Sequence, residues 1–261
     1  MALLGRHLKI AGGLATYCVG TYAAYEYFRP VPPLPSCKDR CCTFNQLAPN
    51  YDKEIEKDES TSGIMDMRKA MIAQASGSVL EVAGGTGRNL SFYGDGVKSL
   101  LITDYSESML QVAARKVAEV RKAAATSAAG ASSSPSTAAG PLSNVTLAVT
   151  DAAKLELPSA SFDTVVDTFG ICSFEEPEAA LHEMRRCCKP GGKVLLLEHG
   201  VSDWSLLAKW QQHRLNRHVV KWGCYWNRDI LGLVERSGLR IKEIQRKHMG
   251  TTLLIVAENP A

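Results

Sequence analysis

The chain has 261 residues, of which 45% are hydrophobic and 22% are charged, and its formal net charge is +3. This composition is ordinary for a globular protein with a substantial core, and the small net charge alone gives no reason to expect a nucleic-acid partner. Eight cysteines are too sparse in a chain of this length for a secreted disulfide scaffold, so reduced thiols are expected.

An apolar segment at residues 10–28 follows a short N-terminal tail at residues 1–9. Its length is close to the roughly 20 residues that a membrane-spanning helix needs, and its tyrosines gather at one end, as aromatic residues do at a membrane interface. We predict that this segment is a transmembrane anchor, with the lipid bilayer as its partner. A cleaved targeting peptide is the alternative, since no acidic residue precedes Glu26.

A Pro-rich linker is predicted at residues 29–43. Closely spaced prolines cannot be helical and are typical of a stiff, extended spacer. Cys37, Cys41 and Cys42 lie in this linker, but a metal site usually needs a second, well-spaced pair of ligands, and the sequence offers no clear one nearby. We therefore expect a local disulfide or plain thiols here, and no metal.

Residues 44–261 have the pattern of a globular domain. Short strands are expected at residues 78–82, 99–103, 145–149, 164–168, 193–198, 241–246 and 252–257, and helices at residues 107–121, 177–188 and 203–222. Strands that alternate with helices predict a parallel sheet covered on both faces. Residues 122–143 are mostly small or proline, which predicts a low-complexity loop insertion without core-forming capacity.

A glycine-rich turn, Ala83-Gly84-Gly85-Thr86-Gly87, follows the first expected strand. Glycines let the backbone turn sharply and let a ligand lie against bare main chain, and a helix after the turn would present free N–H groups. The spacing departs from the G-x-G-x-x-G of dinucleotide sites, and Glu81 stands where a carboxylate would repel a phosphate. A ligand with an amino-acid end, such as S-adenosylmethionine, fits better. A nicotinamide-dependent oxidoreductase is the rival interpretation.

Acidic residues follow the next two strands. Asp104 ends the second strand, where its carboxylate can accept both ribose hydroxyls of an adenosine. Asp151 can accept the adenine amino group, while the backbone N–H of Ala152 reaches a ring nitrogen. Met109 either packs on the adenine face or fills the core. Because ligands of open α/β sheets lie beyond the carboxyl ends of the strands, all of these elements converge on one site.

Together these motifs resemble the class I methyltransferases, and among them the UbiE-like group. The resemblance rests on Ala48-Pro49-Asn50-Tyr51-Asp52, Glu81-x-Ala83-Gly84-Gly85-Thr86-Gly87, Asp104-Tyr105-Ser106-Glu107-Ser108-Met109-Leu110, Asp151-Ala152, Phe162-Asp163 and Lys189-Pro190-Gly191-Gly192. It implies a Rossmann-like α/β fold with a seven-stranded, mostly parallel sheet, an antiparallel last strand and helices on both faces. It also implies S-adenosylmethionine as cofactor, with Tyr51 closing over the site. The predicted cofactor residues are Tyr51, Glu81, Ala83, Gly85, Thr86, Gly87, Asp104, Tyr105, Met109, Asp151, Ala152 and Thr168.

Three further segments, Gly87-Arg88-Asn89, Leu197-Glu198-His199-Gly200 and Gly223-Cys224-Tyr225-Trp226-Asn227-Arg228-Asp229, resemble the membrane-tethered mitochondrial methyltransferases of fungi and protists. This resemblance implies a single-pass protein of the mitochondrial inner membrane. Quinone methyltransferases of the UbiE type differ in this tail, so the methyl acceptor stays unassigned among a lipophilic small molecule, mitochondrial RNA and a protein. A non-catalytic scaffold or assembly factor that keeps the fold is the alternative.

His199 is the candidate catalytic residue, because it follows the fifth strand at the functional edge and a histidine can act as a general base near neutral pH. A histidine that only caps or supports the site is the alternative. Within the helix expected at residues 203–222, the stretch 205–222 carries basic side chains at four-residue spacing, including Lys209 and Arg217. It is a solvated helix face, a surface that rests on an anionic bilayer, or a patch that contacts RNA.

Overall fold

The computed structural model describes residues 13, 14, 16–22, 24, 25, 30, 32–129 and 144–260, and only the backbone of residue 37 and of residues 123–129. The chain divides into two units, Met1–Pro33 and Leu34–Ala261. In the first unit, the described residues between 13 and 25 are helical. Across the described parts of the chain, no helix combines the length and the apolar character needed to cross a membrane. Part of the predicted anchor, including residues 10–12 and 26–28, lies outside the described residues.

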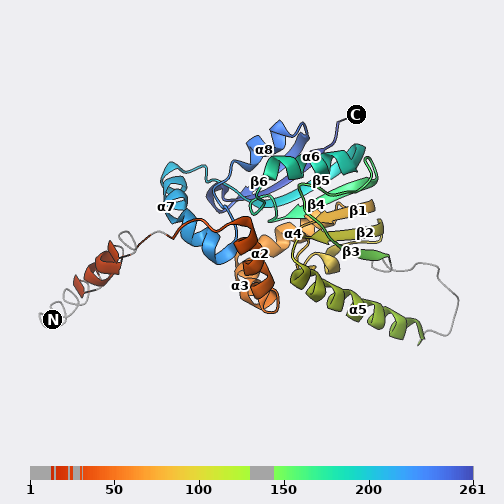
Figure 1. The fold of residues 1–261 in the computed structure, drawn as a ribbon, viewed down its shortest axis with the longest axis horizontal. Helices are drawn as coiled ribbons and strands as arrows, with labels where there is room; N and C mark the ends of the chain where they lie inside the picture. The colour runs from red at the N-terminus through yellow and green to blue at the C-terminus, as the bar shows by residue number, and fades with distance from the viewer. Residues whose placement is uncertain are drawn as a thin grey trace, which may run out of the picture. The chain divides into compact units, whose positions relative to one another are not determined.

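A seven-stranded sheet forms the centre of the second unit (Figure 1). The strands are β1 (Gly77–Val82), β2 (Val97–Asp104), β3 (Val145–Val149), β4 (Phe162–Thr168), β5 (Cys188–His199), β6 (Arg240–Lys247) and β7 (Thr252–Glu258). Their spatial order is β3-β2-β1-β4-β5-β7-β6. Strand β7 runs antiparallel to both β5 and β6, and the other neighbouring pairs are parallel. The predicted mostly parallel sheet with an antiparallel last strand is confirmed.

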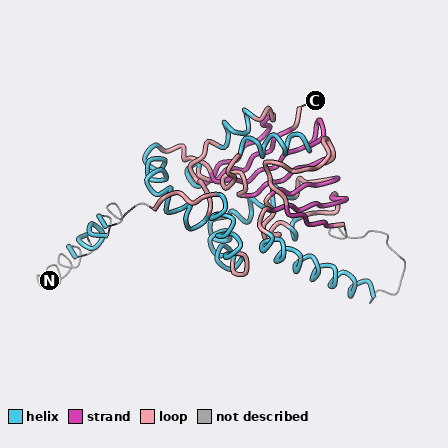
Figure 2. Tube along the Cα trace, viewed as in Figure 1, coloured by secondary structure: helices cyan, strands magenta, loops and turns pink. Residues whose placement is uncertain are grey.

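Helices cover both faces of this sheet (Figure 2). They are α2 (Cys37–Leu47), α3 (Tyr51–Ser62), α4 (Ile64–Ile72), α5 (Glu107–Ala129), α6 (Pro177–Cys187), α7 (Ser205–Trp222) and α8 (Ile230–Arg236). Helices α4 and α5 pack on one face, and α6 and α8 on the other. Along β5, Val194 and Leu196 join the core under α6 and α8, whereas Leu195 and Leu197 join the opposite core. Burial on both faces explains why β5 and β7 contain continuous apolar runs, at residues 194–197 and 253–257.

Helix α2 begins inside the predicted Pro-rich linker of residues 29–43, so the linker prediction is wrong from Cys37 onward. Ser36 accepts a hydrogen bond from the backbone N–H of Asp39, and the Asp39 carboxylate accepts one from the backbone N–H of Ser36. This capping box satisfies two backbone donors directly after the last proline, so the helix can begin there.

Helix α5 continues to Ala129, so the predicted loop at residues 122–143 is wrong for its first eight residues, 122–129. Alanine dominates this stretch, and alanine has the highest helix propensity of all residues. The remainder of the predicted insertion, residues 130–143, lies outside the described residues. Helices α3, α4 and α8, which have 12, 9 and 7 residues, were also not predicted.

Candidate cofactor site

A cavity of about 420 Å³ lies beyond the C-terminal ends of β1 to β4, where the site is predicted. Its volume is within the range of roughly 300–1,000 Å³ that is typical of small-molecule sites. Ten predicted cofactor residues line it, namely Tyr51, Ala83, Gly85, Thr86, Asp104, Tyr105, Met109, Asp151, Ala152 and Thr168. Glu81 and Gly87 are not among the lining residues.

The turn after β1 exposes main chain to this cavity. Ala83 and Gly85 have left-handed backbone conformations, with φ of 49° and 56°. No heavy atom lies within 4 Å of the point where a side chain of Gly85 would begin, so a ligand can lie against the peptide groups. The helix expected after the turn is wrong, because only a 3-10 turn, η1 (Leu90–Phe92), forms there. Main-chain groups of the turn, and not a helix N-terminus, therefore face the ligand.

Glu81 is buried beneath this turn. Its carboxylate accepts hydrogen bonds from Asn89 Nδ2 at 2.8 Å and from the Tyr93 hydroxyl at 2.7 Å. Burial raises the pKa of Glu81 to about 7, although the two hydrogen bonds act in the opposite direction. Asn89 also donates to Thr168 Oγ1 and accepts from Arg68. Glu81 thus supports the turn from behind.

Asp104 lies at the predicted position on the cavity wall. Its Oδ2 accepts the backbone N–H of Gly85 at 2.9 Å, and its Oδ1 accepts that of Ser106 at 2.7 Å. Burial raises the pKa of Asp104 against the effect of these hydrogen bonds. Each carboxylate oxygen keeps a lone pair that can accept a ribose hydroxyl. Met109 is 3% exposed and also lines the cavity, so it belongs to the core and to the cavity wall at once.

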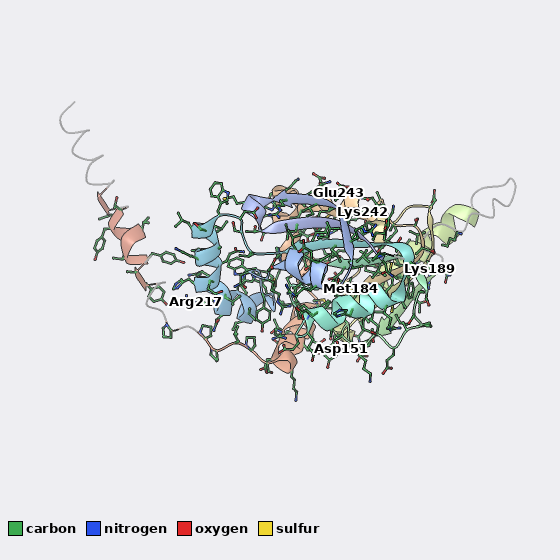
Figure 3. The ribbon with its side chains drawn as sticks, turned by 90° about the horizontal axis from the view of Figure 1, so that it is seen from above. Asp151, Met184, Lys189, Arg217, Lys242 and Glu243 are labelled. Atoms are coloured by element: carbon green, nitrogen blue, oxygen red, sulfur yellow. The ribbon has the colours of Figure 1, made fainter. Side chains whose placement is uncertain are left out.

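Asp151 and Ala152 lie on the loop that follows β3 and line the cavity. Figure 3 labels Asp151 and shows it apart from Arg217 of α7. Oδ1 of Asp151 accepts the backbone N–H of Ala153 at 2.9 Å, which fixes the loop and leaves Oδ2 for a ligand. The carboxylate and the adjacent backbone N–H thus lie on the same wall, as an adenine ring requires.

A polar cluster joins the start of α3 to the glycine-rich turn. Oγ1 of Thr86 donates to Oδ1 of Asp52 at 2.6 Å, and Asp52 also pairs with Lys116 at 2.5 Å and with Arg88 at 3.5 Å. Burial would raise the pKa of Asp52, but these partners hold it below its usual value. Burial raises the pKa of the neighbouring Tyr51, so its hydroxyl stays protonated and can donate into the cavity. The cluster holds Tyr51 against the site.

Apart from Tyr51, the wall contributed by the helices before β1 was not predicted. Arg68 lines the cavity, and its guanidinium donates to Glu59 at 2.6 Å and to Asn89 at 2.9 Å. The Nε of Arg68 is buried and has no partner among the described residues. Cys41 and Phe44 of α2 line the same cavity. A cation on the apolar face of a short amphipathic helix was the signal that could have revealed Arg68.

His199 does not line the cavity. Its ring stacks on Phe169, which does, with the ring centroids 4.3 Å apart. Its Nδ1 faces the sulfur atoms of Cys224 at 3.6 Å and Cys172 at 4.0 Å. The structure therefore places the ring behind Phe169, and a role in catalysis stays a prediction.

Helix α7 carries the predicted basic side chains. Burial lowers the pKa of His218 to about 4, and its ring stacks on Trp226 with centroids 4.0 Å apart, so His218 is uncharged at neutral pH. Trp204, directly before the helix, is 63% exposed, and Leu206 is 81% exposed. The interpretations of residues 205–222 as a solvated face, a bilayer surface or an RNA patch stay predictions.

Comparison with known proteins agrees with this geometry. A family described as "Methyltransferase domain" matches residues 80–196. Methyltransferase OMS1, mitochondrial, of Saccharomyces cerevisiae is 32% identical over 230 residues, which cover 85% of this chain and 46% of the relative. The ubiquinone/menaquinone biosynthesis C-methyltransferase UbiE of Pseudomonas fluorescens is 28% identical over 190 residues, 70% of this chain and 66% of the relative. The chain thus spans about half the length of the first relative and just under two thirds of the second.

Solved structures share the fold. The [4+2]-cyclase SpnF superposes with a TM-score of 0.64 at 14% identity, over 88% of this chain and 98% of that chain. Phosphoethanolamine N-methyltransferase 2 of Haemonchus contortus, solved in complex with S-adenosyl-L-methionine, has a TM-score of 0.53 at 18% identity, over 76% and 52% of the two chains. The sheet order, the lined cavity and these matches agree. Residues 80–196 thus match a methyltransferase domain, and the chain has the fold of the class I S-adenosylmethionine-dependent methyltransferases.

Proposed function

We propose that this chain transfers the methyl group of S-adenosylmethionine to a small, largely apolar acceptor that binds in the same cavity. The observation that carries the proposal is the mixed lining of this cavity. Polar groups of the glycine-rich turn, Asp104 and the backbone of Ala152 line it together with three phenylalanines, Phe44, Phe169 and Phe174. We assign the polar groups to the cofactor, as the cofactor end, and the phenylalanines to the acceptor, as the acceptor end.

At the cofactor end, each part of S-adenosylmethionine has a fitting partner. Asp104 accepts the ribose hydroxyls, and Asp151 and the backbone N–H of Ala152 bind the adenine edge. The unpartnered Nε–H of Arg68 donates to the amino-acid carboxylate. The cofactor supplies a methyl group on a positively charged sulfonium, which needs no further activation. The protein contributes alignment of the acceptor with the bond that breaks.

At the acceptor end, the three aromatic side chains exclude water from an apolar acceptor. The hydroxyls of Tyr51 and Ser173, which also line the cavity, can orient a polar group on it. An RNA acceptor would need an open groove with cationic and stacking residues along a strand. A compact pocket with an apolar wall favours a small molecule instead.

For the place of action, we propose a mitochondrial membrane. The name of the similar yeast protein includes the word mitochondrial, and residues 10–28 are apolar. Alkaline carbonate extraction of mitochondria that carry the tagged full chain tests this proposal. The chain is expected in the membrane pellet, and deletion of residues 10–28 should release it. Recovery of the full chain in the soluble fraction would contradict the anchor.

The activity itself can be tested with the full chain, methyl-tritiated S-adenosylmethionine and separate mitochondrial lipid, RNA and protein extracts. Label should enter material that is soluble in organic solvent, and Asp104→Ala should abolish the incorporation. Label in material that nuclease removes would overturn the small-molecule proposal. A folded chain that binds no cofactor would overturn methyl transfer altogether and support a scaffold.

A further inference from the structure

Three side chains that could hold a metal ion come together behind the acceptor end. Cys172 lies in the turn after β4, His199 ends β5, and Cys224 follows α7. The Cys224 sulfur lies 3.2 Å from the Cys172 sulfur and 3.6 Å from Nδ1 of His199, which is 4.0 Å from the Cys172 sulfur. Within the described parts of the chain, no second group of this kind occurs. In the sequence, Cys172 and Cys224 lie 27 and 25 residues from His199. These separations are too long for a short metal-binding motif, and no metal was predicted.

The spacing of these atoms fits zinc. A tetrahedral ion with Zn–S bonds near 2.3 Å and Zn–N bonds near 2.05 Å places two sulfurs about 3.8 Å apart and each sulfur about 3.6 Å from the nitrogen. The two sulfur-to-nitrogen distances, 3.6 and 4.0 Å, are close to this value. The two sulfurs, 3.2 Å apart, would have to separate by about 0.6 Å when the ion binds. A disulfide would need sulfurs about 2.05 Å apart and would give the nitrogen no partner. We propose that Cys172, His199 and Cys224 together bind one zinc ion.

The surroundings hold the three ligands in place before an ion arrives. Cys172 is fully buried and Cys224 is 6% exposed. The backbone N–H of Tyr225 donates to the carbonyl of Cys172 at 2.7 Å, which joins the two cysteine loops directly. The backbone N–H of Cys172 donates to Glu198 at 3.0 Å. A site whose ligands are fixed by other hydrogen bonds loses little conformational freedom when the ion binds.

The chemistry of the set favours zinc over harder cations. Two thiolates and a neutral imidazole are soft to borderline ligands, which suit zinc and not magnesium or calcium. Binding releases the two thiol protons, and the occupied site carries no net charge, as a buried site requires. Three protein ligands leave a fourth position for water or another ligand.

The ion would join three segments that are distant in the sequence and that flank the cavity. His199 stacks on Phe169, and Ser173 follows Cys172, so both neighbours of the cluster line the acceptor end. The proposed ion therefore supports the wall that contacts the acceptor. This role is additional to cofactor binding, which uses other residues.

The test is the zinc content of the full chain purified without chelators, measured by inductively coupled plasma mass spectrometry. We expect about one zinc per chain in the wild type and loss of most of it in Cys172→Ala, Cys224→Ala and His199→Ala. Cys187→Ala is the matched control, because Cys187 is equally buried but lies in α6 outside the cluster, and it should keep its zinc. Substitution with Co²⁺ should give thiolate-to-cobalt charge-transfer absorption in the wild type. This absorption should be lost in the three cluster variants.

Three outcomes would overturn the proposal. The first is that the wild type neither contains nor takes up zinc, and the second is that the cluster variants keep their zinc. The third is that mass spectrometry of the intact protein detects a disulfide between Cys172 and Cys224. Calorimetric titration with S-adenosylmethionine on the same samples separates this proposal from the proposed function. Cofactor binding without zinc would reject only the ion, and zinc without cofactor binding would reject only the methyl transfer.

Discussion

The cofactor end and the acceptor end of the cavity are built in different ways. At the cofactor end, the segments that follow neighbouring strands are joined by hydrogen bonds from backbone N–H groups to strand-end side chains, such as that from Gly85 to the carboxylate of Asp104. At the acceptor end, side chains distant in sequence hold the wall, as where Arg40 of α2 binds the Tyr225 hydroxyl at 2.8 Å and also Glu175. Short sequence motifs therefore determine the cofactor end, whereas contacts between segments distant in the sequence determine the acceptor end.

The largest effect is expected at the cofactor end. Asp104→Ala removes the acceptor of two backbone N–H groups that shape the turn, and with it the proposed acceptor of two ribose hydroxyls. Loss of charge-assisted hydrogen bonds should weaken cofactor binding by about 3 kcal/mol, which is about 100-fold. Isothermal titration calorimetry measures this change, with Asp95→Ala, an exposed aspartate outside the cavity, as control. Equal affinities of the two variants would contradict the assignment of the cofactor end.

A second effect concerns the support beneath the turn. A buried acid whose folded-state pKa is about 7 instead of the ordinary 4.5 destabilises the fold increasingly as pH rises between these values, because the unfolded chain ionises first. Glu81 should therefore cost the wild type about 3 kcal/mol of unfolding free energy between about pH 4.5 and pH 7. Urea unfolding at several pH values should show that Glu81→Gln loses correspondingly less stability over this range. The exposed Glu119→Gln should follow the wild type, and parallel curves for all three proteins would refute the buried titration.

At the acceptor end, a change should affect methyl transfer without affecting the cofactor. Phe44→Ala removes an aromatic wall of the cavity, which should slow transfer to the lipid-soluble acceptor about tenfold for roughly 1.4 kcal/mol of lost contact. Cofactor affinity should stay within about twofold of the wild type. Phe92→Ala, outside the cavity, is the control. A large loss of cofactor affinity in Phe44→Ala would mean that the two ends are not separate.

The smallest effect tests the junction between the two ends. Thr86→Val removes the hydrogen bond from Thr86 to Asp52 that fixes the start of α3. One such bond is worth about 1 kcal/mol, so cofactor affinity should fall about fivefold by calorimetry. Thr146→Val, an exposed change on β3, should leave the affinity unchanged. If Thr86→Val binds the cofactor as well as the wild type does, the cluster around Asp52 does not shape the site.

The features that the sequence predicts also differ between the cofactor end and the acceptor end. The strands, their mostly parallel order and the positions of Asp104, Asp151 and Ala152 were predictable, because periodicity and strand-end motifs are local signals. Helix α2 was taken for part of a linker, since the capping box is easily overlooked beside four prolines. The role of Arg68 and the approach of His199 to two cysteines depend on contacts between distant segments, which no local pattern records.

The capping box of α2 also decides where a shortened version of this protein can begin. A fragment that starts at Leu34 keeps Ser36 and Asp39 and so keeps the first turn of the helix. A fragment that starts at Phe44, the boundary that the linker prediction suggests, lacks Arg40 and Cys41 and opens one side of the cavity. N-terminal truncations of this protein should therefore end before Ser36. A shorter fragment that stayed in solution would have an incomplete cavity, so its activity would not represent that of the whole chain.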